Sequence, residues 1–294
     1  MLKNLSRERA GEIFIVSQAL LASLFPVITK LTLTSMGPLP ALAWSMFFVL
    51  LFFLAFSFIK NSWVKLLDTE ALTSLIGAAA IFGIAFPLLQ FIGIKYTSAG
   101  NAGIILTLEV FFTFLFFNVW RKDYIKTQYI WGCVLMFISA VVVLLPNFSE
   151  FHKGDFIILS ALLLTPFGNL LQKRVREKVG SEGILLFRVM LAVPILFLIT
   201  LLSGEQFVPS GGGVWVILAL NGLLYFGLSK VFWLEGIYRI SITKSSALNS
   251  IAPIFTLFFA FLFLKNIPTI TQILAIPLAI AGVYLLTRLP QNVG

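Results

Sequence analysis

The chain has 294 residues, of which 59% are hydrophobic and only 11% are charged, and its net charge is +9. Soluble domains contain about 25% charged residues, and a chain this apolar would expose large adhesive patches in water, so the composition excludes an ordinary soluble protein. The net charge does not indicate nucleic-acid binding, because Lys and Arg occur in short clusters between apolar runs. The composition therefore predicts an all-α integral membrane protein.

Ten apolar segments are long enough to cross a bilayer as helices, which takes about 20 residues each. Short turns rich in proline, glycine and polar residues separate them, so no soluble domain fits between them. The first segment lacks a cleavage site and is predicted to be a span, not a removable signal peptide. The predicted spans are residues 12–33, 38–59, 71–92, 98–120, 127–146, 154–173, 184–203, 213–235, 243–264 and 269–288.

Lys and Arg are concentrated in the loops on the side of the two termini. Cytoplasmic loops carry an excess of these residues. The pattern therefore predicts a multi-pass protein of the cell (inner) membrane with both termini in the cytoplasm.

A single fixed shift aligns the first half of the chain with the second without gaps. Glycine and polar matches at one shift are harder to attribute to chance than matches among apolar residues. Each half, 11–146 and 154–289, contains five predicted spans, so the second half begins on the opposite side of the membrane. This predicts two inverted repeats, an architecture of secondary transporters in which the substrate site lies near the midplane between the halves. The matches include Gly11 with Gly154, Lys30 with Lys173, Gly93 with Gly236, and Phe112-Thr113 with Phe255-Thr256.

Two stretches at equivalent positions carry a family resemblance. They are Gly93-Ile-Lys-Tyr-Thr-Ser-Ala-Gly-Asn-Ala102 followed by Leu108-Glu109-Val-Phe, and Gly236-Ile-Tyr-Arg-Ile-Ser-Ile-Thr-Lys-Ser-Ser-Ala247 followed by Ile251-Ala-Pro-Ile. On these residues each half resembles an EamA domain of the drug/metabolite transporter superfamily. The resemblance covers nearly the whole chain. It implies ten helices and a central cavity walled by spans 1, 3, 4, 6, 8 and 9, but it does not specify a substrate.

The chain departs from the family pattern at its charged positions. The family's Leu-Glu-Pro-Val is split between the halves: the first keeps Glu109 without the proline, and the second has Ala252 but keeps the proline. The family's arginine in the second span of a repeat is present as Arg188, while Ser45 occupies the equivalent position of the first half. Compared with the family pattern, the symmetry of the repeats is thus broken at the charged positions, which implies that the two halves have different functional roles.

Glu109 lies about halfway along its predicted span. A carboxylate at that depth costs about 3 kcal/mol or more unless it faces a wet cavity or a partner, and its side chain cannot snorkel to the interface from there. Two roles remain open. Glu109 binds a cationic group of the substrate or takes up a proton during transport, or it is a protonated side chain in a structural hydrogen bond between helices.

Further polar and aromatic side chains lie within the predicted spans. Lys230 pairs with Glu109, binds a substrate carboxylate or snorkels to the cytoplasmic interface, whereas Arg188 is expected to snorkel or to form a structural pair. Buried amides must face protein or water, either as binding groups or as structural hydrogen-bond partners. Asn118, Asn169 and Gln172 are expected near the cytoplasmic interface. The predicted substrate-binding residues are Gln18, Gln90, Glu109, Asn221, Tyr225, Lys230, Trp233 and Asn249.

The sequence contains no Walker loop, no Ser/His/Asp arrangement and no metal-ligand spacing, so no cofactor, metal or enzymatic activity is predicted. The predicted function is a secondary active transporter that exports amino acids or small metabolites by alternating access. Proton coupling through Glu109 is a hypothesis. An intramembrane enzyme, a channel and a nucleotide-sugar or drug carrier of the same superfamily remain alternatives.

Overall fold

The computed structural model describes residues 6–60, 72–116, 127–144, 152–209, 211–249 and 251–287, and every regular element in these ranges is helical. This confirms the predicted all-α class. Six helical units are long and apolar enough to cross a membrane, and four shorter apolar helices fall within the other predicted spans. The ten-span count therefore stays a prediction. The six units are Arg7–Thr32, Pro38–Phe58, Leu72–Lys95, Lys153–Arg176, Ser181–Ser203 and Gly212–Arg239.

The helices follow one another with few irregular residues between them. The first half contains α1 (Arg7–Ser23), α2 (Phe25–Thr32), α3 (Pro38–Lys60), α4 (Leu72–Ala79), the π-helix η4 (Ala80–Ala85), α5 (Phe86–Lys95), α6 (Ala99–Leu106), α7 (Glu109–Phe114) and α8 (Thr127–Leu144). The second half contains α9 (Lys153–Leu162), α10 (Thr165–Arg176), α11 (Ser181–Ser203), α12 (Gly212–Leu220), the π-helix η7 (Asn221–Ser229), α13 (Lys230–Arg239), α14 (Ile242–Asn249), α15 (Ala252–Leu264) and α16 (Ile270–Thr287).

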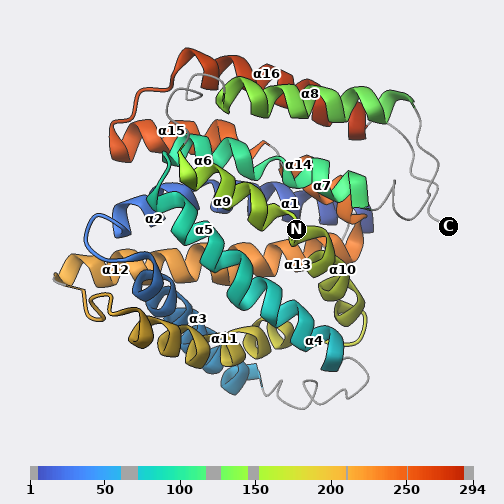
Figure 1. Ribbon diagram of the computed structural model, residues 1–294. Helices are drawn as coiled ribbons and strands as arrows, with labels where there is room; N and C mark the ends of the chain where they lie inside the picture. Colours follow the sequence, from blue (N-terminus) through green and yellow to red (C-terminus); the bar gives the residue numbers. More distant parts are fainter. Residues whose placement is uncertain are drawn as a thin grey trace.

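Two helix pairs form opposite sides of the molecule (Figure 1). Helices α8 and α16 pack together on one side, and α3 and α11 pack together on the other. Most of the remaining helices lie between these pairs, while α4 lies beside α11. The outer helices carry exposed apolar side chains such as Trp131 and Leu202, which suits a surface in contact with lipid.

Breaks interrupt the first span of each half at a proline. Helix α1 ends just before α2, which has Pro26 as its second residue, and α9 ends before α10, which has Pro166 as its second residue. Proline has no N–H and cannot donate to the carbonyl four residues earlier. The hydroxyl of Thr165 donates instead to that carbonyl, Leu162 O, at 2.8 Å. The break is therefore stabilised without leaving a buried carbonyl unpaired.

Two more discontinuities recur in both halves. The π-helical segments η4 and η7 interrupt the third span of each half, and such segments often mark functional sites. The predicted span 98–120 is not one continuous helix, because a turn at Thr107 and Leu108 separates α6 from α7. The Thr107 hydroxyl donates to Ile104 O at 2.5 Å and helps to satisfy this turn. Irregular backbone at membrane depth is tolerated where it lines a cavity, and Glu109 directly follows this one.

Glycines allow close contact between the halves. Helix α1 packs on α13, and α5 packs on α9. A methyl group on Gly154 would lie 2.2 Å from Gly93 O, and one on Gly236 would lie 2.2 Å from the Cδ1 of Ile15. A larger residue at Gly154 would meet fixed backbone and separate α5 from α9, whereas one at Gly236 would displace the Ile15 side chain. The glycines therefore allow the two halves to approach closely at these crossings.

Candidate functional site

A cavity lies where helices of both halves meet, with about 860 Å³ of atom-free space counting its open part. Its walls come from the spans that the family resemblance implies, with one additional side chain, Arg188, from α11. Five aromatic side chains give the cavity an apolar component: Phe82, Phe86, Tyr225, Phe226 and Trp233. The predicted residues that line it are Gln18, Gln90, Glu109, Tyr225, Lys230, Trp233 and Asn249.

Asn169 connects Glu109 to Trp233. Its Nδ2 donates to Glu109 Oε1 at 3.0 Å, and its Oδ1 accepts from Trp233 Nε1 at 2.9 Å. An indole nitrogen can only donate, so the amide oxygen must face Trp233 and the NH₂ group must face Glu109. The carboxylate oxygen Oε1 is therefore held as an acceptor by a group from the other half of the chain.

The prediction that Asn169 and Gln172 are interfacial is wrong. Both are buried, with exposed fractions of 0% and 2%, and both line the cavity. The reason is that α10 continues to Arg176, beyond the predicted end of this span, so the two amides lie inside the helix bundle. Two amides in an apolar run were the sequence signal for them. Asn118, predicted as interfacial with them, lies outside the described residues.

Arg188 does not snorkel to the interface. It is only 2% exposed and lines the cavity. Its aliphatic stem crosses η4 at Gly83, where an added methyl group would lie 3.0 Å from Arg188 Cγ. Nη1 donates to Gln172 Oε1 at 3.4 Å, whereas Nε and Nη2 have no hydrogen-bond partner among the described residues. The residue was singled out by the family resemblance, but the sequence did not indicate that it reaches the cavity.

Lys230 lies against an aromatic ring of the cavity wall. Its Nζ is 4.1 Å from the centroid of the Tyr225 ring, a cation–π contact. The Tyr225 ring stacks on Phe25 with centroids 3.8 Å apart, and its hydroxyl donates to Gln90 Oε1 at 3.4 Å. Lys230 therefore points inward. Glu109 and Arg188 both lie within electrostatic range of its charge.

All four predicted amides have a polar atom without a partner among the described residues: Gln18 Oε1, Gln90 Nε2, Asn249 Oδ1 and Asn221 Oδ1. The first three residues line the cavity, whereas Asn221 does not. A buried polar atom left unpaired costs about 1–3 kcal/mol, so water or a bound solute is expected to supply the missing hydrogen bonds.

Asn221 is the predicted site residue that the structure does not bring to the cavity lining. It is fully buried, and its Nδ2 donates to Thr29 Oγ1 at 3.0 Å. As the first residue of η7 it faces α2 and joins the two halves of the chain. Asn221 therefore has a structural role. Its residue type and its depth in the span are the same as those expected of a binding amide, so the sequence could not distinguish the two roles.

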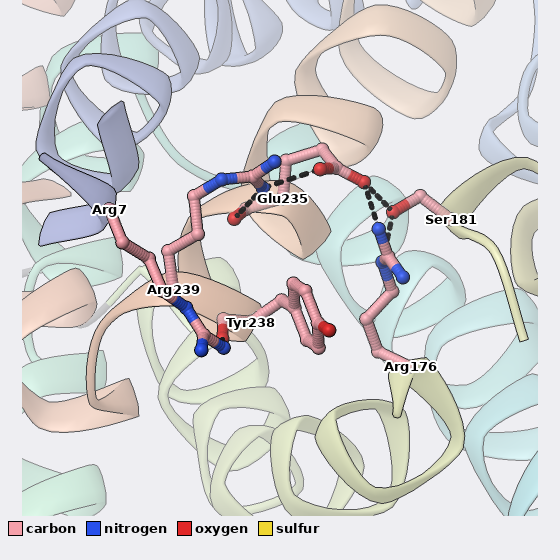
Figure 2. Close-up of polar contacts among 6 residues, drawn as sticks. All are labelled: Arg7, Arg176, Ser181, Glu235, Tyr238 and Arg239. Atoms are coloured by element: carbon pink, nitrogen blue, oxygen red, sulfur yellow. Dashed lines mark hydrogen bonds and ion pairs between the residues drawn. The ribbon is translucent and has the colours of Figure 1, made fainter. Parts of the chain in front are cut away.

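A second polar cluster lies at the ends of α1, α10, α11 and α13, separate from the cavity lining (Figure 2). The Glu235 carboxylate accepts from Arg176 at 2.6 Å and pairs with Arg239 of its own helix. Figure 2 shows the Tyr238 ring between the guanidinium groups of Arg7 and Arg176. Because Arg7 belongs to the first half and the other residues to the second, the cluster joins the halves at this end.

The chain matches the EamA-like transporter family twice, over residues 9–145 and 152–288. It is 25% identical over 194 residues to an uncharacterized transporter, YyaM, of Bacillus subtilis (strain 168), and the match covers 63% of each protein. A protein of known crystal structure has a similar fold, with a TM-score of 0.76 at 15% identity over 95% of this chain and 96% of the other. The family match shows that the chain belongs to this family, and the match to the crystal structure shows the fold alone.

Proposed function

Because the chain belongs to the EamA-like transporter family and is a multi-pass membrane protein, we propose that it is a secondary active transporter working by alternating access. It exports amino acids or other small metabolites through the cavity between its halves. The proposal includes ten spans in two inverted repeats, 11–146 and 154–289. It also includes location in the cell (inner) membrane with both termini in the cytoplasm.

Equivalent features of the two halves support the inverted repeats. Both halves have a proline-associated break in the first span, a π-helical segment in the third and a discontinuity in the fourth. In Figure 1 the chain runs from α1 to α2 in one direction and from α9 to α10 in the opposite direction. Discontinuous helices around a midplane cavity are typical of secondary transporters with this architecture.

The observation that carries the proposal is the set of polar groups that meets in one cavity between the halves. Glu109 provides a carboxylate, while Arg188 and Lys230 provide cations in the same cavity. Partnerless amide atoms and five aromatic rings complete the lining. A small solute that carries both charges and an apolar part, such as an amino acid, complements this lining.

Glu109 is proposed to bind the cationic group of the solute or to take up a proton during the transport cycle. Asn169 Nδ2 donates to Oε1, and this contact is compatible with either protonation state of the carboxyl group. An intramembrane carboxyl group of this kind is a common part of proton relays in transporters.

Counterflow in proteoliposomes tests the proposal. The purified protein is reconstituted, loaded with unlabelled solute and given a trace of labelled amino acids, nucleosides or amines outside. Saturable exchange of one class supports a carrier and identifies the substrate class. Conductance without saturation, or chemical turnover of the solute without exchange, would contradict it.

A further inference from the structure

We propose that Arg188 binds a carboxylate of the transported solute. This inference rests on the proposed transport function and names the chemistry that one part of the cavity recognises. It assigns Arg188 a direct contact with the solute in place of the interfacial role that its sequence position suggested.

The free edge of the guanidinium group has the geometry of a carboxylate site. Nε and Nη2 are the two nitrogens on the same edge, and their N–H bonds run nearly parallel. Neither atom has a partner among the described residues, although the side chain is only 2% exposed and lines the cavity. Parallel N–H donors of this kind bind the two oxygens of a carboxylate in a bidentate pair. A buried guanidinium edge without a partner is otherwise unfavourable.

The remaining contacts of Arg188 hold this edge in place. Nη1, on the opposite side of the group, donates to Gln172 Oε1 at 3.4 Å. The stem passes the π-helical segment η4 at Gly83, where an added methyl group would lie in tight contact, 3.0 Å from Arg188 Cγ. One end of the guanidinium is thus anchored to α10 and its stem to η4, so that the free edge is the part available to a solute.

Lys230 is less suited to this role. Its ammonium group already lies 4.1 Å from the centre of the Tyr225 ring, and it is a point charge without a paired edge. Glu109, in the same cavity, disfavours a solute group with more than one negative charge. A single carboxylate therefore suits this cavity better than a phosphate dianion.

Phenylacetate and phenylacetamide provide a matched pair of probes, because they differ only in the carboxylate and both carry a ring that suits the aromatic lining. Their binding to the purified protein in detergent is measured by calorimetry. We expect phenylacetate to bind at least about tenfold more tightly, because each charge-assisted hydrogen bond contributes more than a neutral one. In Arg188→Gln this preference disappears, whereas in Lys230→Gln, which removes the other cation of the cavity, the loss is smaller.

Arg188→Lys serves as a second variant, since it keeps the charge but lacks the paired edge. It is expected to lose most of the preference, and it keeps the test valid where Arg188→Gln does not fold. Equal binding of the two probes to the unaltered protein, no binding of either, tighter binding of benzylphosphonate, or a preference lost in Lys230→Gln and kept in Arg188→Gln would each overturn the inference. Binding is measured without transport, so a preserved preference with no counterflow would refute only the proposed function.

Discussion

The two halves of the chain differ most where they face the cavity. Arg188 of the second half reaches across Gly83 into the cavity, whereas Ser45, at the equivalent position of the first half, donates back to Ala41 O of its own helix. Glu109 of the first half and Ala252 of the second occupy equivalent positions and both line the cavity, but of the two only Glu109 carries a charge. The two halves thus contribute opposite charges to the cavity: the first contributes the Glu109 carboxylate, and the second contributes the cations Arg188 and Lys230.

The same halves agree where they build the scaffold. Gly154 contacts Gly93 at one crossing, and Gly236 meets α1 beside Gly11 at the equivalent crossing. Lys30 Nζ donates to the carbonyl of Thr97, and Lys173 Nζ donates to the carbonyl of Ile240, which is the residue equivalent to Thr97. Scaffold contacts are therefore kept in both copies, while the charged side chains of the cavity lining are not.

Glu109→Gln is expected to have the largest effect, because it removes a carboxylate that the second half cannot replace, having Ala252 at the equivalent position. Transport in proteoliposomes should be lost or uncoupled from the proton gradient, with the melting temperature of the protein little changed. The matched control is Glu177→Gln at an exposed glutamate after α10, which should transport normally. Unchanged transport by Glu109→Gln at every pH would contradict the role given to this carboxylate.

Asn169→Leu is expected to reduce transport by about tenfold or more, because it leaves Glu109 Oε1 and the Trp233 N–H without their shared partner. The first half has Pro26 at the equivalent position, so this bridge exists in one copy alone. Trp233→Phe is the comparison variant. It removes the indole donor but keeps the contact with Glu109, and should have a smaller effect on initial transport rates. Equal losses in both variants would show that the contact with Glu109 contributes nothing.

Gly154→Ala is expected to destabilise the protein by about 1–3 kcal/mol or more, because the added methyl group meets backbone atoms that cannot rotate away. Gly11→Ala, at the equivalent position, meets the Cβ of Arg239 at 2.9 Å and the Cγ2 of Ile240 at 3.0 Å, milder overlaps that a smaller shift relieves. Unfolding in detergent should therefore show the larger loss for Gly154→Ala. The reverse order would mean that the two crossings are not packed as described.

Lys30→Met should have the smallest of these effects, a loss of about 1–2 kcal/mol in the free energy of unfolding. Lys30 Nζ donates to three carbonyls at the end of α5, those of Ile94, Lys95 and Thr97, at 3.0, 3.2 and 2.6 Å. Lys173 donates to Ile240 O alone, at 3.3 Å. Lys173→Met is therefore expected to be less destabilising in the same thermal unfolding measurement, and equal losses would argue against this difference.

Much of the site could be predicted from residue type and depth. Glu109, Gln90 and Gln18 were placed at the cavity because polar groups inside a span must face protein or water, and the family resemblance indicated which spans form the walls. The same reasoning misplaced Asn221, which is equally polar and equally deep but turns toward Thr29. One residue along a helix rotates a side chain by about 100°, so small errors in helix orientation decide which group faces the cavity.

The sequence by itself determined the apolar helices, the family and the presence of one carboxylate deep in a span, because these follow from composition and from motifs that are local in the chain. The tertiary structure decided which groups meet. Arg188 reaches the cavity because Gly83, on a helix distant in sequence, leaves a path for its stem. Asn169 joins Glu109 to Trp233 because helices of both halves converge there. Such contacts depend on the relative rotation and depth of several helices, which no single segment of sequence specifies.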